Sequence, residues 1–324
     1  MTPSTGIGIV LPPDLTASEL TAFARRADDL GFDALWVVED CFLNGGIAQA
    51  ATALAVTRRL TVGLALLPAG ARNPAFAAME VATLARFHPG RLLVGVGHGM
   101  PDWMRQVGSW PTSPLTLLEE YLGALRALLA GERVTTEGRY VRLDGVRLAA
   151  PPERPPAVLA GVRGPRSLRV AGRAADGVLL AEPVTPEYLA TAREQTAAPA
   201  GHLLVAYNIA AVADDGDAAL EAARPALKWI GEPAWRPHLA PLPFADELTA
   251  LRAAAGSPKE FTARLPDAWV QRLAVAGTPQ HARAHLASLR RAGATQVVLS
   301  PAGPDPFAAL DSLARLLRAP RISG

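Results

Sequence analysis

A glycine-rich segment in the middle of the chain has the composition of an anion site. Its residues are Gly161, Val162, Arg163 and Gly164, and a helix-forming stretch follows from residue 168 to 175. Glycine lets a ligand approach the backbone closely, and the free N–H groups and dipole of a helix N-terminus attract negative charge. The segment therefore predicts a phosphate site. An ordinary turn between a strand and a helix is the alternative interpretation.

Two side chains are candidates for proton transfer. His98 follows the apolar run 92–96, and Asp40 follows the apolar run 34–38. An unperturbed imidazole changes charge near pH ~6.5, so His98 can give or take a proton at neutral pH. The alternatives are that His98 is only a wall of a pocket and that Asp40 caps the next helix. Helix capping is the favoured role of the neighbouring Glu39.

The remaining reactive residue types give weaker signals. Residues 95–99 form a GxGxG string, but the third glycine of the dinucleotide fingerprint is missing, so these glycines better suit a flat ring lying against the backbone. Cys41 is interpreted as a small buried filler. His281 and His285 stand four residues apart with no carboxylate to complete a ligand set, and we predict no metal site.

Charge and composition exclude several classes of partner. The chain has 324 residues, with 32 basic and 30 acidic side chains mixed along it, so a nucleic-acid partner is not expected. A single cysteine excludes an internal disulfide framework. The first apolar run, 7–11, is far too short to cross a bilayer, and the start of the chain lacks signal-peptide order. We expect no membrane association and a cytoplasmic location.

The elements that must position these residues are short apolar strands alternating with helices. The eight expected strands are residues 7–11, 34–38, 61–67, 92–96, 157–160, 178–180, 203–212 and 296–300. Continuous apolar runs are typical of parallel strands covered on both faces. Helix signals between them include a capping box, Thr16 to Glu19, and prolines at 74 and 114 near helix starts. The pattern predicts a (β/α)8 TIM barrel.

Two stretches are too long for a single helix. Residues 131–156 alternate in polarity and contain turn residues at 137–138 and 144–145, which predicts a small antiparallel excursion. Residues 214–278 are proline-punctuated, mostly helical in pattern, and predict an insertion beside the barrel mouth. With no linker or short repeat, residues 1–324 are interpreted as one domain. Active sites of such barrels lie where the strands end, so the candidates above are expected to converge there.

Four segments together resemble the luciferase-like monooxygenase superfamily, in particular its coenzyme F420-dependent branch typified by methylenetetrahydromethanopterin reductase. They are residues 31–40, 68–74, 90–99 and 158–180, and residues 274–279 resemble the end of the family's insertion. The resemblance implies that the turn 161–164 holds the cofactor phosphate and that Gly97, His98 and Gly99 border the ring. It also implies that Asp40 lies near the ring. A nonprolyl cis peptide pressing against the ring is implied within Leu64, Ala65 and Leu66.

Two departures from the family limit what the resemblance implies. Many relatives have histidine where this chain has Cys41, and sugar-phosphate dehydrogenases of the branch have glutamate where it has Met100. A glucose 6-phosphate dehydrogenase is therefore disfavoured, and His98 becomes the candidate replacement proton donor. The implied activity is hydride exchange between F420 and a small organic substrate in a homodimer. The alternatives are an FMN-dependent two-component monooxygenase and a flavin-binding protein without catalysis.

Overall fold

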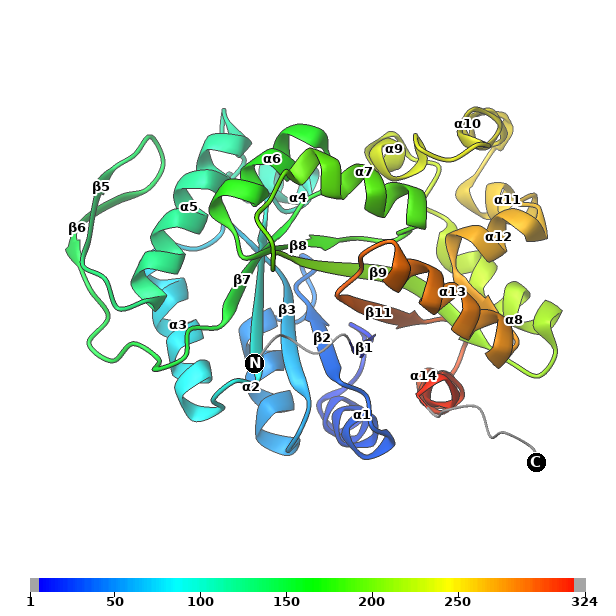
Figure 1. Cartoon of the computed structure of the whole chain (residues 1–324), viewed down its shortest axis with the longest axis horizontal. Coiled ribbons are helices and arrows are strands. Elements are labelled where there is room, and N and C mark those ends of the chain that lie inside the picture. The colour runs from blue at the N-terminus through cyan, green and yellow to red at the C-terminus, as the bar shows by residue number, and fades with distance from the viewer. Residues whose placement is uncertain (1–5, 318–324) are drawn as a thin grey trace.

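The computed structural model describes residues 6–317, in which eight parallel strands close into a barrel (Figure 1). The ring runs β9-β11-β1-β2-β3-β4-β7-β8, and pairing of β8 with β9 closes it. The strands are β1 (Ile7–Val10), β2 (Ala34–Val38), β3 (Thr61–Pro68), β4 (Leu92–Gly97), β7 (Ala157–Gly161), β8 (Gly177–Leu180), β9 (Leu203–Val212) and β11 (Gln296–Pro301). All eight predicted strands are present, and the predicted TIM barrel is confirmed.

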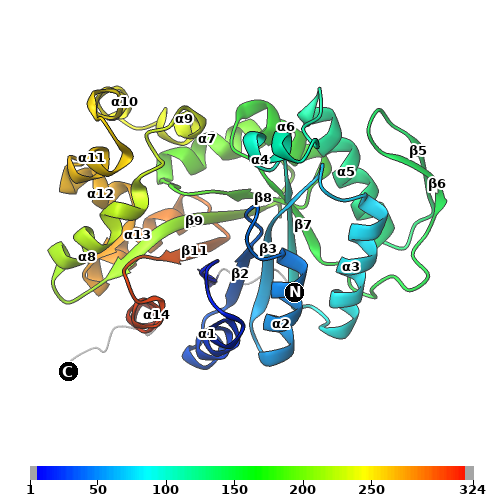
Figure 2. The ribbon, with the colours of Figure 1, turned by 180° about the vertical axis from the view of Figure 1, so that it is seen from behind.

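Helices cover the outside of this barrel in both views (Figures 1 and 2). They are α1 (Ala17–Leu30), α2 (Gly46–Val56), α3 (Pro74–Phe87), α5 (Pro114–Leu129), α6 (Pro165–Ala174), α7 (Pro186–Thr196), α13 (Pro279–Arg291) and α14 (Pro306–Leu313), with a 3-10 turn at Ala314–Leu316. The short helix α4 (Pro101–Gln106) lies at the mouth of the barrel instead. The predicted capping box begins α1, because Glu19 N–H donates to Thr16 Oγ1 and Thr16 N–H donates to Glu19 Oε2.

Inside the barrel, side chains of opposing strands form a separate small core. Trp36 of β2 is fully buried and donates from Nε1 to Gln296 Oε1 at 2.8 Å. Its ring meets the ring of Tyr207 in β9 edge-on, with centroids 5.7 Å apart. A Cβ at Gly63 would come within 2.2 Å of the indole, so glycine is required there. These rings fill the barrel beneath its mouth.

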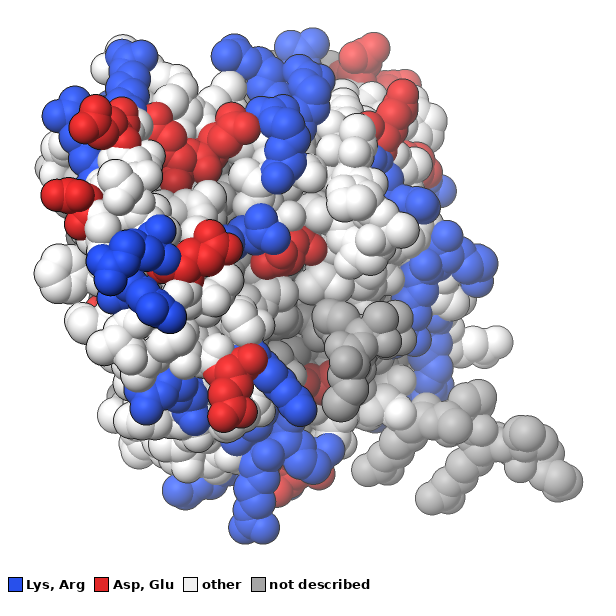
Figure 3. All heavy atoms as spheres, turned by 60° about the vertical axis from the view of Figure 1, so that its left-hand side comes forward, with Lys and Arg blue, Asp and Glu red and all other residues white. Residues whose placement is uncertain are grey.

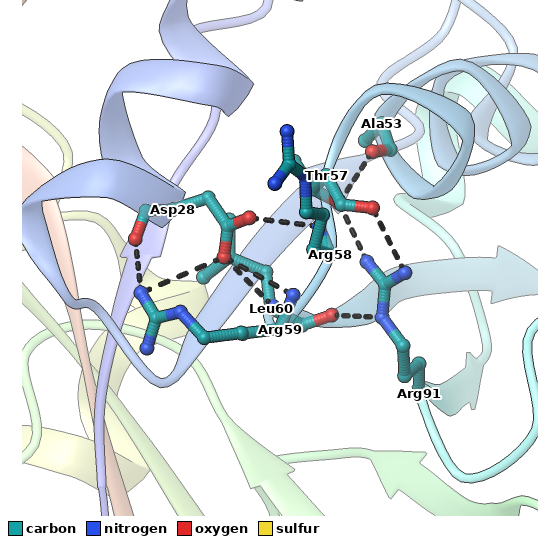
Figure 4. Close-up of polar contacts among 7 residues, drawn as sticks. All are labelled: Asp28, Ala53, Thr57, Arg58, Arg59, Leu60 and Arg91. Atoms are coloured by element: carbon teal, nitrogen blue, oxygen red, sulfur yellow. Dashed lines mark hydrogen bonds and ion pairs between the residues drawn. The ribbon is translucent and has the colours of Figure 1, made fainter.

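Polar contacts fix the opposite end of the barrel, where the strands begin (Figure 4). The Asp28 carboxylate at the end of α1 accepts from the N–H of Arg58 at 2.7 Å and from the N–H of Leu60 at 3.1 Å. Arg91, just before β4, donates to the carbonyl of Leu60 at 2.9 Å and to the Thr57 carbonyl at 3.0 Å. These bonds fix the starts of β3 and β4 relative to each other. They therefore also fix the relative positions of the carboxyl ends of these two strands.

Residues 131–156 contain a two-stranded antiparallel sheet of β5 (Val134–Glu137) and β6 (Arg142–Val146). Gly145, expected in a turn after the strand, lies within β6 instead. The register shifts there, and the N–H of Gly145 donates to Thr135 Oγ1 at 2.9 Å. Glu120 of α5 anchors the tip of the hairpin by accepting from three successive backbone N–H groups, 139 to 141, at 2.9–3.0 Å.

Residues 214–278 fold into short helices around a second hydrophobic cluster. The elements are α8 (Gly216–Ala223), α9 (Arg236–Leu239), α10 (Ala245–Ala254), α11 (Pro258–Ala263) and α12 (Asp267–Leu273), with 3-10 turns at Arg224–Leu227 and Pro233–Trp235. A short strand, β10 (Val275–Gly277), pairs in parallel with the end of β9. Three residues carry too little pattern to be recognised as a strand in sequence. The insertion and the β5–β6 hairpin lie at opposite ends of the molecule (Figures 1 and 2).

The surface carries no large field of one sign on the face shown in Figure 3, where acidic and basic side chains are interspersed. Within residues 6–317, none of the helices combines the length and apolar character needed to cross a bilayer.

Candidate active site

A cavity of about 420 Å³ opens at the carboxyl ends of the strands. Nine of the eleven residues predicted for the site line it: Asp40, Ala65, Leu66, His98, Gly99, Gly161, Val162, Arg163 and Gly164. They come from β2, β3, β4, β7 and the loops that follow these strands. The volume lies within the roughly 300–1,000 Å³ of small-molecule sites.

The two other predicted residues, Leu64 and Gly97, do not line the cavity. Successive side chains of a strand point to opposite faces, so Leu64 packs outward toward α2 while Ala65 faces the cavity. Gly97 is covered by Leu66, whose Cδ2 lies 2.7 Å from where a Cβ of Gly97 would be. The cis peptide expected in this segment is present as the Ala65–Leu66 bond.

The glycine-rich turn divides into two parts with different surroundings. Gly161 ends β7, and a Cβ there would lie 2.4 Å from Cδ2 of Leu66, so the residue is held against the cavity floor. Gly164 is the N-cap of α6, with φ −96° and open space around its missing Cβ. No side chain caps α6. The amides of Arg166 and Ser167 in its first turn are therefore available to an anion.

Two carboxyl groups face the cavity from opposite sides of the barrel. Asp40 stands at the solvent-exposed rim after β2. Partial desolvation by the surrounding protein raises the pKa of its carboxyl. Glu182 follows β8. Burial raises the pKa of Glu182, the Arg163 charge opposes this effect, and the charge of Asp40 adds to it. The two groups thus favour the protonated form more than a free carboxyl does.

His98 is held between two helix starts. Its Nε2 lies 3.1 Å from Oγ of Ser167 in α6. Burial lowers the pKa of His98, and the nearby carbonyl of Pro114 at the start of α5 opposes that shift without cancelling it. The imidazole is therefore neutral at pH 7, which differs from the expected ring titrating near pH ~6.5.

The neighbours of Asp40 have structural roles. Glu39 pairs with Arg72, Oε1 to Nη1 at 2.5 Å, and accepts from the N–H of Gly46 at 2.7 Å, so it caps α2 as predicted. Cys41 lines the cavity rim. Burial raises the pKa of the Cys41 thiol, and the charges of Glu39 and Asp40 raise it further. A neutral thiol is a poor nucleophile, but the side chain is half-buried at the rim, so the expectation of a buried filler is wrong.

The outer wall of the cavity is largely aromatic. Met100, Trp103 and Trp110 line it from α4 and the loops around that helix. The Arg105 guanidinium lies 5.4 Å from the centroid of the Trp110 ring and pairs with Asp102 at 2.7 Å. The wall therefore offers flat apolar surface, with its nearest cation already paired.

The insertion closes the side of the cavity next to β7 and β8. Arg163 lies over the Trp235 ring, 4.6 Å from its centroid, and donates to the carbonyl of Ala234 at 3.2 Å. Trp235 donates from Nε1 to the carbonyl of Glu182 at 2.9 Å. His238 Nδ1 lies 3.2 Å from the carbonyl of Pro183. The Arg163 side chain is thus engaged with the insertion.

Comparison with known proteins identifies the family. The luciferase-like monooxygenase family model matches residues 4–296. The chain belongs to this family. The 5,10-methylenetetrahydromethanopterin reductase of Methanolobus tindarius is 28% identical over 313 residues, covering 92% of this chain and 95% of that protein.

Solved structures of the luciferase-like family share the fold. The coenzyme F420-dependent tetrahydromethanopterin reductase of Methanopyrus kandleri superposes with a TM-score of 0.81 at 22% identity, covering 95% of this chain and 97% of that one. An FMN complex of the 3,6-diketocamphane monooxygenase component from Pseudomonas putida superposes with a TM-score of 0.72 at 16% identity, covering 97% of both chains. The fold alone therefore accommodates either type of cofactor.

Two cavity residues of this luciferase-like protein have no distinctive sequence signal. Glu182 is visible only as a polar residue after an apolar run, and Tyr207 lies inside the long apolar run of β9. In a strand buried on both faces the sequence does not show which residues point inward. Among the described residues, no group of three or more His, Cys, Asp or Glu side chains could hold a metal ion.

Proposed function

We propose that this luciferase-like protein is a coenzyme F420-dependent oxidoreductase that exchanges a hydride with a small organic substrate. One observation carries the proposal: a single cavity joins a free helix N-terminus at α6 to two carboxyl groups with raised pKa values. Similarity to a methylenetetrahydromethanopterin reductase over nearly the whole chain supports it, as does the fold shared with an F420-dependent reductase.

The residues present fit a deazaflavin cofactor. The amides of the first turn of α6 would hold its phosphate, and Gly164 leaves the approach open. Ala65, Leu66 and Gly161 would form the surface beneath the ring. His98 and Gly99 would border the ring from β4. When bound, reduced F420 supplies the hydride, and the protein supplies position.

The proton that accompanies the hydride is assigned to Asp40. Its raised pKa makes it a better donor at neutral pH than a free carboxyl, and it stands at the cavity rim where a substrate enters. His98, kept neutral by burial, can accept a hydrogen bond or a proton but is a weak donor at pH 7. In the direction of substrate oxidation His98 would be the base, and in reduction Asp40 would be the acid.

A second candidate is an FMN-dependent two-component monooxygenase, which the fold shared with an FMN-bound monooxygenase favours. A third is a flavin-binding protein without catalysis. Titration with F420, and separately with FMN, distinguishes them. We expect an absorbance change near ~420 nm on F420 binding and bleaching on reduction. Oxygen consumption with reduced FMN would instead support the monooxygenase, and binding without turnover the third candidate.

The anion site has a matched pair of test variants at Gly164. Gly164→Ala introduces a methyl group into open space, so F420 affinity should stay within about threefold. Gly164→Asp adds an N-cap side chain that occupies the first-turn amides and repels phosphate, so affinity should fall at least ~10-fold while α6 is not destabilised. Equal F420 affinity in both variants would show that phosphate does not bind at α6.

We also propose that the protein is a cytoplasmic homodimer. Phe76 and Met79 on α3 are 64% and 52% exposed, and such side chains are the apolar surface that a second copy would cover. Sedimentation velocity on the wild type and on Phe76→Ser tests the dimer, and fractionation of source cells tests the location.

A further inference from the structure

Tyr207 brings an unpaired hydroxyl to the floor of the cavity. The residue is 6% exposed and lines the cavity from β9, yet its Oη has no hydrogen-bond partner. Its ring already packs edge-on against Trp36. A phenylalanine would make the same ring contact without burying a polar atom, so the hydroxyl costs stability in the unliganded protein.

Other buried polar atoms without partners do not share this position. In residues 6–317 they belong to Glu80, Tyr121, Glu187, Asn208, His238 and Arg283, and none of these residues lines the cavity. Tyr121 is the closest counterpart, a fully buried tyrosine of α5 with an unpaired hydroxyl. Among these atoms of the described residues, only the Tyr207 hydroxyl is therefore placed to be satisfied by a ligand bound in this cavity.

The Tyr207 hydroxyl is available as a hydrogen-bond donor. Burial raises the pKa of Tyr207, and the charge of Glu182 raises it further, so the phenol keeps its proton. Glu182 does not accept from it in this structure. The Tyr207 side chain belongs to an apolar cluster that includes Trp36 and Leu179. Its neutral O–H therefore suits an uncharged acceptor better than an anion, because an anion would lose its hydration there.

We propose that the Tyr207 hydroxyl donates a hydrogen bond to a carbonyl oxygen of the molecule bound in the cavity. The inference deepens the proposed function and rests on it. Two sources supply a carbonyl, the pyrimidine ring of a flavin or deazaflavin and an uncharged carbonyl substrate. Tyr207 is therefore a binding residue that orients one of them over the cavity floor.

The experiment compares wild type, Tyr207→Phe and Tyr121→Phe. F420 and FMN are titrated into each protein, and cyclohexanone is then titrated into each F420 complex as an uncharged carbonyl probe, with binding followed by fluorescence. Tyr207→Phe should weaken one of these affinities about threefold to tenfold, the scale of one neutral hydrogen bond, while Tyr121→Phe leaves it unchanged. Neither variant should lower the melting temperature of the unliganded protein.

The outcomes distinguish the two sources of the carbonyl oxygen, the cofactor ring and the substrate. They also distinguish failure of the Tyr207 inference from failure of the proposed function. A weaker F420 or FMN complex, with a raised carbonyl stretching frequency in its Raman spectrum, assigns the bond to the cofactor ring. Unchanged cofactor affinity with weaker cyclohexanone binding assigns it to the substrate. Equal affinities for all probes in the three proteins overturn the role of Tyr207 and leave the proposed function standing. If wild type binds neither F420 nor FMN, the proposed function falls and this inference falls with it.

Discussion

The β5–β6 hairpin and the insertion 214–278 both interrupt the alternation of strands and helices, but they leave the barrel from opposite ends. The hairpin follows the end of α5 and precedes the start of β7, so it leaves from the face away from the cavity. The insertion follows the carboxyl end of β9 and reaches the cavity, where Ala234 is a lining residue. The end of the strand from which an excursion departs thus decides whether it shapes the site.

The contacts of the two excursions reflect this difference. The hairpin is held by Glu120 through backbone amides and packs along α5. The insertion is held by hydrogen bonds that end on the backbone of Glu182 and Pro183, next to a cavity carboxyl. A substitution that weakens the hairpin contacts should lower only the stability of the protein. One that weakens the insertion contacts should lower both stability and turnover.

The largest effect on turnover is expected at Asp40, on the cavity rim. Asp40→Asn removes the proposed proton donor and should lower F420-linked turnover ~100-fold or more, with F420 affinity nearly unchanged. Wild-type reduction should also decline as pH rises through the raised pKa of Asp40, and the variant should lack this decline. Stopped-flow hydride transfer from pH 5 to 9 measures both effects. If His98→Ala loses far more activity than Asp40→Asn, the donor is misassigned.

The next largest effect is expected in the pH dependence of folding stability, through His238 of the insertion. Burial, with the Arg163 charge adding to it, lowers the pKa of His238 to about 3. The unfolded chain therefore takes up this proton near pH ~6.5 and the folded chain only near pH 3, so folding stability is lost as pH falls between these values. At about 1.4 kcal/mol per pKa unit, the loss between pH 7 and pH 4 amounts to about 3 kcal/mol.

His238→Phe should remove that part of the pH dependence while keeping the stacking on Tyr188. Urea unfolding at several pH values compares the variant with wild type and with His281→Phe, which changes an exposed histidine of α13. Identical slopes of stability against pH in wild type and His238→Phe would contradict the assignment.

A smaller effect is expected from the insertion's contact with Glu182. Trp235→Phe removes the N–H donated to the Glu182 carbonyl but retains an aromatic ring beneath Arg163. Turnover should fall about threefold to tenfold, and the free energy of unfolding by about 1 kcal/mol. Steady-state kinetics and urea titration measure the two quantities. Unchanged turnover would show that the insertion only covers the cavity.

The smallest effect is expected at the hairpin. Glu120→Gln keeps one acceptor oxygen but loses the charge that strengthens its bonds to the 139–141 amides, so unfolding free energy should fall by about 1 kcal/mol. F420 affinity and turnover should match wild type. A catalytic defect here as large as that of Trp235→Phe would break the distinction between the two excursions.

The barrel was predictable because its local signals agree with its global pattern. The capping box at Thr16 and the prolines at 74 and 114 all lie where the structure has helix starts. Strand β10 was not predictable, since its three residues are strand-like only through pairing with β9. The expected turn at Gly145 also failed, because a shift of register absorbs it inside β6.

The site was predictable as a set of strand ends but not in its side-chain orientations. Leu64 and Gly97 were expected beside the ring, and neither lines the cavity, because a buried parallel strand gives no alternation that marks its inner face. The turn 161–164 was expected to hold a phosphate, and the Arg163 side chain within it packs on Trp235, which comes 72 residues later. Such long-range partners are set by the folded chain and have no local signature.

The only sulfhydryl of the chain, Cys41, lies at the cavity rim. A maleimide dye would therefore attach at that one place without any engineering of the sequence. Because the pKa of the thiol is raised, labelling needs mildly alkaline buffer and long incubation. The attached fluorophore would report occupancy of the cavity directly, and a bound ligand that shields the rim would slow its attachment, which gives a screen for ligands that requires no knowledge of the reaction.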